Sequence, residues 1–414
     1  MSRELMDARK IDVNENARQC VEAPIWFLDL TAWTAAVAVS GYPVAALIST
    51  YAGVSDNSVS VIFRLFVVGL AAVAFWRGAA RAPMVAPDGW LMLFLLVYAT
   101  RLIWDFTEPD VVGVDFAIQN FIAAAMIPAF AIALHVRSWD ERNVAWCFLT
   151  VGTLVCAGGL WLNAAGLAGD AVLYDTTGRL SFEKVNPITL GHVACTTVLA
   201  ALVLGPDRGS KLFRGLMLAC AGVALWMLYL AASRGPVVSL VCCLAAYSLA
   251  RGAWAHALAI AVAIYVAIGV LELVDVGSLA ETLRFTEVGT DASSLDRFQE
   301  IDEALEEFEE NPWLGSSYAL PSGGWPHNIF VEAAMATGVP GLALFVIVSL
   351  RSLSASLWAF NAGYRFAALL LVQFLVAGQF SGSLWGLPGL WIGVAVLMAL
   401  RRNDLPNAVF LVPR

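Results

Sequence analysis

The chain has 414 residues, of which 60% are hydrophobic and 14% are charged, and its formal net charge is −9. Soluble proteins carry about 25% charged residues, so the composition excludes an ordinary soluble domain. The mean hydropathy is +0.75, and the apolar residues are concentrated in runs long enough to cross a bilayer. We therefore expect an all-α polytopic membrane protein.

About twelve apolar runs approach the ~20 residues that cross a bilayer as a helix. They cover roughly 25–48, 58–78, 89–105, 114–135, 143–167, 187–204, 212–231, 236–250, 254–273, 328–350, 364–380 and 384–400. The sequence thus predicts an N-terminal tail (1–23), helices 1–9 (24–273), a long loop (274–327), helices 10–12 (328–400) and a C-terminal tail (401–414). The N-terminal tail has no apolar core of the kind that marks a signal peptide.

Basic residues indicate the orientation. If the N-terminus is cytoplasmic, most of the 24 lysines and arginines fall in cytoplasmic segments. The positive-inside rule then predicts that both termini are cytoplasmic and that the long loop is periplasmic. The cysteines do not suggest a disulfide framework or a zinc site, because six of the seven lie in apolar runs.

Several basic residues lie on the opposite side of the membrane from the majority, and each of these needs a partner there. They are Arg64, Arg101, Arg179, Lys184, Arg234, Arg284 and Arg297. For four of them, pairing with acids of the same face, such as Asp105, explains the placement as well as binding of a ligand would. These four are Arg64, Arg101, Lys184 and Arg284. The other three have placements that favour anion binding.

Arg234 lies in the sequence AASRGPVVSL, directly before an expected span that begins at Pro236. Proline suits the first turn of a helix, and the preceding glycine permits a tight turn. The free N–H groups of a helix N-terminus favour an anion, and a guanidinium adds a fork for phosphate. Arg179 has a similar placement, in a polar stretch that leads into the span opened by Asn186 and Pro187.

Arg297 lies in SSLDRFQEIDEALEEFEENP, which reads as an amphipathic helix that ends at Asn311-Pro312. Its expected apolar face consists of Leu295, Phe298, Ile301, Leu305 and Phe308. Arg297 lies at the margin of this face, so packing of the face against the membrane helices would turn Arg297 towards them. The alternative is a surface helix in which Arg297 pairs with Glu300.

His327 precedes Asn328, which is a good N-cap for the next helix. The positive end of a helix dipole and nearby arginines disfavour imidazolium, so we expect a neutral imidazole near pH 7, as a general base requires. The alternative is a structural histidine, which is also how we interpret His192. Further along, Gly338-Val339-Pro340-Gly341 predicts a break, after which the helix either kinks or continues towards Phe360.

These motifs together resemble the O-antigen ligase and polymerase superfamily of bacterial envelopes. The most specific one is His327-Asn328, followed after nine residues by Gly338 and then by Gly341. The sequences SRG at Ser233–Gly235 and NPWLG at Asn311–Gly315 also resemble the core of that superfamily.

The resemblance implies a metal-independent, inverting glycosyltransferase of the bacterial inner membrane whose active site faces the periplasm. Its donor would be a glycan on undecaprenyl diphosphate, and no cofactor or nucleic acid would take part. A ligase would use lipid A–core as acceptor, and a polymerase would use another lipid-linked glycan. Arg179, Arg234 and Arg297 would hold the diphosphate and His327 would act on the acceptor hydroxyl, with Asn328, Gly338 and Gly341 in support.

Two alternatives from other classes remain open. A transporter would show inverted repeats and charges near the bilayer midplane, whereas here no repeat is clear and the unusual charges gather near one face. A metal-dependent glycosyltransferase would need paired carboxylates, for which Asp105, Glu108, Asp110 and Asp115 are the candidates.

Overall fold

The computed structural model describes residues 29–52, 58–81, 83–109, 111–165, 172–174, 179–182, 185–205, 210–253 and 292–408. The expected N-terminal tail and the expected ninth span, 254–273, lie outside these residues, as do Lys184 and Arg284. The described part is a helical bundle with a single small antiparallel sheet, in which Val172 pairs with Phe182 and Tyr174 with Leu180.

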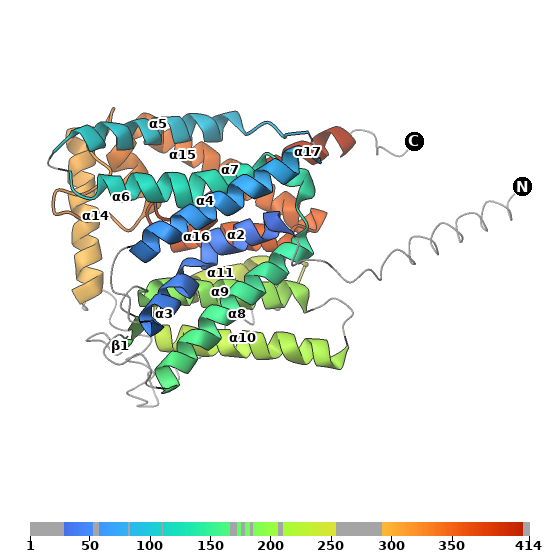
Figure 1. Ribbon diagram of the computed structural model, residues 1–414. Coiled ribbons are helices and arrows are strands. Elements are labelled where there is room, and N and C mark those ends of the chain that lie inside the picture. Colours follow the sequence, from blue (N-terminus) through green and yellow to red (C-terminus); the bar gives the residue numbers. More distant parts are fainter. Residues whose placement is uncertain are drawn as a thin grey trace, which may run out of the picture.

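The helices follow one another in chain order (Figure 1). The first half holds α2 (Leu30–Ser40), α3 (Tyr42–Tyr51), α4 (Ser58–Ala79), α5 (Gly89–Thr107), α6 (Val114–Gln119), the π-helix η2 (Asn120–Met126), α7 (Ile127–Ala133), the 3₁₀ turn η3 (Val136–Ser138) and α8 (Glu141–Ala165). The second half holds β1 (Val172–Tyr174), β2 (Leu180–Phe182), α9 (Pro187–Leu204), α10 (Lys211–Ala231), α11 (Arg234–Ala250), α14 (Ala292–Glu310), α15 (Ile329–Ala362), α16 (Arg365–Ala377) and α17 (Pro388–Ala408).

Seven helices in the described residues are long and apolar enough to cross a membrane. The pair α2 and α3, bent by 62°, counts as an eighth span if it is taken as one. The helices α11 and α16 are apolar but shorter. An all-α polytopic membrane protein is therefore confirmed, while the number of twelve spans stays a prediction.

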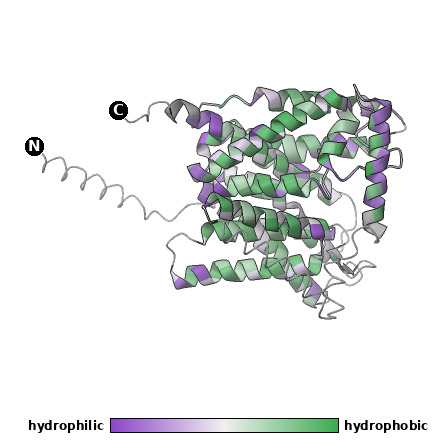
Figure 2. Ribbon diagram, turned by 180° about the vertical axis from the view of Figure 1, so that it is seen from behind, coloured by the Kyte–Doolittle hydropathy of each residue, from purple (hydrophilic) through white to green (hydrophobic). Residues whose placement is uncertain are grey.

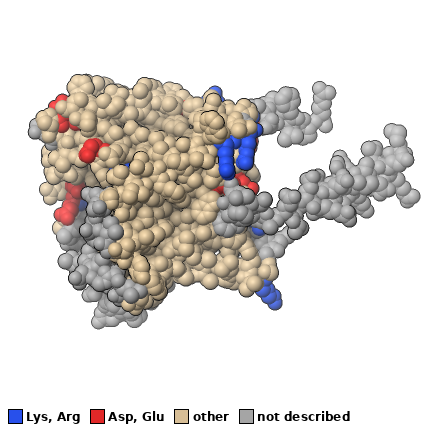
Figure 3. Space-filling view, viewed as in Figure 1, with Lys and Arg blue, Asp and Glu red and all other residues tan. Residues whose placement is uncertain are grey.

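The side wall of the bundle is apolar, as a lipid-facing surface must be. Large hydrophobic side chains are exposed on its outer helices, for example Phe66, Trp76, Leu96 and Leu218. A soluble protein avoids such a continuous apolar surface. Figure 2 shows hydrophobic residues along most of the bundle helices, with α14 mostly hydrophilic across one end. In Figure 3 basic side chains gather at the end where both termini emerge, and acidic ones are prominent at the α14 end.

The predicted break in α15 is present at Gly338, which has φ 66° and ψ −170°. The NPWLG loop docks into this break, since the Val339 N–H donates to the Pro312 carbonyl over 2.7 Å. A Cβ on Gly338 would lie 2.5 Å from the carbonyl carbon of Trp313. The NPWLG loop and the break at Gly338, which are separate motifs in the sequence, thus contact each other directly.

Beyond the break, α15 continues to Ala362 instead of ending near residue 350. The structure combines the two paths left open for the segment, because the helix is kinked at Gly338 and also continues past Phe360. Arg351 on this half forms an ion pair with Asp88, the N-cap of α5, over 2.5 Å. That contact lies at the end of the bundle where the termini emerge (Figure 1).

The amphipathic helix α14 is present, but its predicted apolar face was wrong. Leu295, Phe298 and Leu305 are 51%, 52% and 41% exposed. The buried residue is Ala304, which packs against Leu320 and Met335. The small side chain of Ala304 lets the helix approach closely, and the approach brings Arg297 and Glu300 on the same face inwards.

Candidate functional site

His327 lies at the point where the α14 loop enters α15, and its backbone conformation is unusual. Its φ is +50°, a left-handed value uncommon for a residue with a side chain. Asn328 caps α15 by accepting from the N–H groups of Phe330 and Val331 at 3.0 and 3.2 Å. The Ile329 N–H donates to the Gly378 carbonyl over 2.9 Å. The chain on one side of His327 is therefore fixed both to α15 and to the end of α16.

A buried carboxylate fixes the neighbouring loop between α16 and α17. Glu332 is fully buried and accepts from the Tyr98 hydroxyl at 2.6 Å and from the Leu384 N–H at 2.8 Å. Because a buried polar group needs hydrogen-bond partners, these two hydrogen bonds tie α5, α15 and the loop together. The loop, which runs from Gly378 to Leu387, then forms one wall of a cavity.

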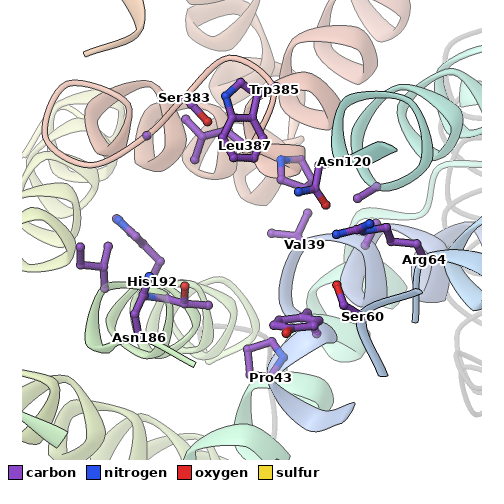
Figure 4. Close-up of a pocket in the computed structure, with 18 of the residues that line it drawn as sticks. Val39, Pro43, Ser60, Arg64, Asn120, Asn186, His192, Ser383, Trp385 and Leu387 are labelled. Carbon is purple, nitrogen blue, oxygen red and sulfur yellow. The ribbon is translucent and has the colours of Figure 1, made fainter. Parts of the chain in front are cut away.

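The cavity has a volume of about 870 Å³. Its walls come from α2, α3, α4, α6, η2 and α9 and from the loops that hold His327 and Ser383. Figure 4 shows Asn186 and His192 on one side, Arg64 and Ser60 on another, and Trp385 and Leu387 above them. A largely apolar cavity with a few convergent polar groups is the usual form of a ligand site.

His327 lines this cavity and stands beside two aromatic side chains. Its ring centroid is 5.2 Å from that of Trp325, which in turn packs edge to face on Trp385 at 5.3 Å. Its Nδ1 atom is buried and has no hydrogen-bond partner among the described residues. One ring nitrogen is thus left for a ligand.

The pKa of His327 is lowered to about 4, first by burial and then by the positive charge of Arg297. A contact with the Ser381 backbone acts in the opposite direction. The expectation of a neutral imidazole agrees with this environment, although burial contributes more than the arginine. Above about pH 5 the ring therefore carries no charge.

Glu300 on α14 faces the same histidine. Its Oε2 atom lies 3.6 Å from His327 Nε2, within ion-pair range but longer than a hydrogen bond. Burial raises the pKa of the Glu300 carboxyl, and Arg297 partly offsets that increase. Arg297, Glu300 and His327 thus form one electrostatic group at the α14 end of the bundle.

Arg234 stands in the first turn of α11, close to its predicted position just before that helix. A Cβ on the following residue, Gly235, would lie 3.5 Å from Phe380 and from Ser381 Oγ. The α11 N-terminus therefore abuts the loop that walls the cavity. Arg179 is half-buried directly before β2. None of the three predicted arginines is among the residues that line the cavity, although Arg297 acts electrostatically on His327.

Two cavity residues were not assigned a role from the sequence. Arg64 is buried in α4, where pairing with an acid was one expectation. Instead its Nη1 donates to Gln119 Oε1 over 2.7 Å. His192 is buried, lines the cavity, and has no hydrogen bond to either ring nitrogen among the described residues. A charge inside an apolar span was the one available signal for Arg64.

The candidate carboxylates do not form a cluster in the described part of the chain. Asp105 is buried, pairs with Arg101 and accepts from the Tyr318 N–H at 2.9 Å. The pairing expected for Arg101 is thus confirmed. Asp115 lines the cavity instead, Glu108 is exposed, and Asp110 lies outside the described residues. Among the residues described, no three His, Cys, Asp or Glu side chains are grouped as a metal site.

A comparison with known families decides which superfamily the chain resembles. Residues 218–346 match the family model described as O-antigen ligase. The resemblance to the O-antigen ligase superfamily is confirmed. The matched region runs from α10 into α15, so it contains Arg234, Arg297, His327 and the α15 break with its docked loop. A comparison with curated proteins found no match.

Within this superfamily region, the structure brings together Arg297, Glu300 and His327, with the α11 N-terminus against the neighbouring loop. The remaining cavity walls come from the helices between α2 and α9 and from the segment between Phe374 and Pro388, both outside the matched region. The family match therefore does not cover the residues that form the cavity walls opposite His327.

Proposed function

We propose that this protein is a membrane glycosyltransferase that moves a glycan from a polyprenyl diphosphate to a sugar hydroxyl. The reaction we favour is ligation of an O-antigen from undecaprenyl diphosphate to lipid A–core at the periplasmic face of the inner membrane. The observation that carries the proposal is a neutral histidine on the wall of a large cavity, beside an arginine, within the O-antigen ligase match.

In the proposed reaction, the acceptor hydroxyl oxygen attacks the anomeric carbon of the donor sugar. The bond from this carbon to the diphosphate oxygen breaks, and polyprenyl diphosphate leaves with the bonding electrons. A ring nitrogen of His327 takes the hydroxyl proton. Attack opposite the leaving group inverts the anomeric centre, and no metal is needed if cations of the protein offset the charge of the diphosphate.

Arg297 and Arg234 are the cations proposed for that role, with Arg179 as a third. Arg297 already acts electrostatically on His327. Arg234 adds the N-terminal N–H groups of α11, which favour an anion. Guanidinium groups bind phosphate through two parallel hydrogen bonds, and they act most strongly where water is excluded.

Glu300 suits a positioning role for His327. When the ring takes a proton it becomes a cation, and a carboxylate 3.6 Å from Nε2 stabilises that cation. Nε2 faces Glu300, and the buried Nδ1 has no hydrogen-bond partner among the described residues, so Nδ1 is the nitrogen proposed to take the acceptor proton. In hydrolytic triads a carboxylate orients the histidine base and stabilises its protonated form in the same way.

The experiment that tests the function is the glycan phenotype of a deletion strain, complemented with the wild-type gene. A ligase predicts long lipid-linked chains that never reach lipid A–core. Single repeat units on lipid A–core would instead identify the polymerase of the same superfamily. If glycan accumulates unchanged on the cytoplasmic side, the protein is a transporter and the proposal is wrong.

A further inference from the structure

Arg64 carries a positive charge inside an apolar membrane helix and is only 7% exposed. Charged residues within membrane spans are costly and mark functional sites by default. Among the described residues, none of the ion pairs involves Arg64. Its direct contacts are an amide and an aromatic ring, and the Asp115 carboxylate acts on the guanidinium electrostatically without forming an ion pair with it.

The orientation of Arg64 is fixed from two sides. Nη1 donates to Gln119 Oε1 over 2.7 Å, and the guanidinium carbon lies 4.6 Å from the centroid of the Phe116 ring. A guanidinium has five N–H donors, and Gln119 takes one of them. In Figure 4 the guanidinium of Arg64 points into the cavity, on the side of Ser60 and Asn120.

The helix that supplies these neighbours is irregular where it reaches the cavity. Gln119 is the last residue of α6, and the π-helix η2 begins at Asn120. Single π-helical turns inside α-helices are frequent at functional sites. Here the irregular turn presents two consecutive amide side chains, Gln119 and Asn120, to the cavity.

The chemistry of this wall suits an acidic saccharide. A guanidinium fork matches the two oxygens of a carboxylate or a phosphate. Amide groups both donate to and accept from hydroxyls. Phe116 and Trp385, whose rings meet edge to face at 5.8 Å, provide the apolar surface. Asp115 also lines the cavity, is exposed, and acts electrostatically on Arg64, so an anionic ligand at this wall has to compete with that carboxylate.

We propose that Arg64, Gln119 and Asn120 form a subsite that binds an oxyanion carried by the saccharide, a carboxylate or a phosphate, in the cavity that His327 lines. That the oxyanion is carried by a saccharide rests on the proposed transferase function. The diphosphate stays assigned to Arg234 and Arg297, neither of which is among the residues that line this cavity.

The test measures ligand binding by the purified full-length protein in lipid nanodiscs, by calorimetry. The probes are methyl glucuronoside, glucose 6-phosphate, neutral methyl glucoside and inorganic diphosphate. The wild type should bind at least one acidic sugar more tightly than methyl glucoside, and the preferred one shows whether the oxyanion is a carboxylate or a phosphate. Arg64→Gln should weaken that binding by about tenfold or more, as expected for one charged hydrogen-bonded pair, and Arg64→Lys by less.

Arg77→Gln is the matched control, because Arg77 is exposed in the last turn of the same helix. It should leave all binding unchanged, and both variants should keep the wild-type unfolding temperature. The proposal is wrong if the wild type does not distinguish acidic from neutral sugar. It is also wrong if Arg64→Gln weakens neutral sugar equally, or if it weakens diphosphate as much as Arg234→Ala does. Normal sugar binding without any glycosyl transfer would overturn the proposed function alone.

Discussion

At His327, burial and the charge of Arg297 act in the same direction on the imidazole. Both lower its pKa, which is about 4. The left-handed backbone holds the ring at the cavity wall, between Trp325 and Glu300. A base with this pKa is weaker than one tuned to pH 7, so the carboxylate that stabilises its protonated form becomes important.

Removing that carboxylate should slow transfer without affecting donor binding. For Glu300→Gln we expect a loss of about tenfold or more in the transfer rate, because the imidazolium that forms loses its counter-charge. Donor binding should stay within about twofold, since the arginines remain. Glu306, which is exposed on the same helix, provides the control variant Glu306→Gln. An unchanged rate in Glu300→Gln would show that the carboxylate has no positioning role.

The second prediction concerns the arginines proposed to hold the diphosphate. Arg234→Ala and Arg297→Ala should each reduce transfer by about 10²–10³, the usual effect of losing one positioned donor to a developing charge. Arg→Lys should restore only part of the activity, since ammonium lacks the planar fork. The control is Arg251→Ala, which removes a guanidinium that donates to Tyr247. Near-normal rates in both alanine variants, at equal protein level, would contradict the assignment.

At the scale of elements, the contact between the NPWLG loop and the α15 break joins the α14 segment to the membrane helices. Gly338 needs its positive φ, and any Cβ there would meet the Trp313 carbonyl carbon at 2.5 Å. Gly315 on the loop is similar, with φ 73° and backbone atoms of Ala336 at 2.5 Å from a Cβ. The Ser316 N–H donates to the Met335 carbonyl over 2.8 Å.

Substitution of Gly338 should therefore loosen α14 as well as α15. We expect Gly338→Ala to destabilise the protein by about 1–3 kcal/mol, the usual cost of a backbone conformation that essentially only glycine adopts. Gly222→Ala on α10 is the control, because nothing lies within 4 Å of a Cβ there. Thermal unfolding in nanodiscs and protease sensitivity of α14 measure the effect. Equal stability of the two variants would show that the contact between the NPWLG loop and Gly338 does not stabilise the protein.

The break and the amphipathic helix could both be predicted from glycine, proline and capping signals, which act over a few residues. The packed face of α14 could not, because hydrophobic periodicity assumes that the apolar side is buried. Here Arg297 and Glu300 turn inwards to reach His327, and Leu295 and Phe298 stay exposed. Nor could the cavity be predicted, since Arg64 and His192 come from helices far apart in the chain.

At the scale of the whole molecule, charge and the position of α14 agree with one orientation. Basic side chains gather at the end where the termini emerge, and α14 lies across the opposite end (Figures 1 and 3). The positive-inside rule predicts that the α14 end is periplasmic. The proposed transfer needs that side, because His327 and the cavity residue Trp325 lie in the loop between α14 and α15.

Labelling with a membrane-impermeant thiol reagent checks the orientation. In a cysteine-free background, Asp302→Cys, exposed on α14, should react in cells whose outer membrane alone is permeabilised. A cysteine at Arg402, near the opposite end, should react only after lysis. The half-buried Ser317 in the same loop as His327 should behave like Asp302. Protection of Asp302→Cys until lysis would reverse the topology and exclude a periplasmic site.

In the proposed reaction, neutral His327 takes the proton of the acceptor hydroxyl. The pH dependence of transfer by the purified protein in liposomes, with donor binding measured alongside, tests this role. The active form has a neutral ring and an ionised Glu300, so the wild-type rate should fall on acidification, through protonation of Glu300, whose carboxyl pKa burial raises, and of His327 at about pH 4. His327→Ala should bind donor normally yet lose about 10²–10⁴ in rate. If His327→Gln, which cannot act as a base, retains most of the wild-type rate, or if the wild-type rate does not fall near pH 4, His327 is not the base.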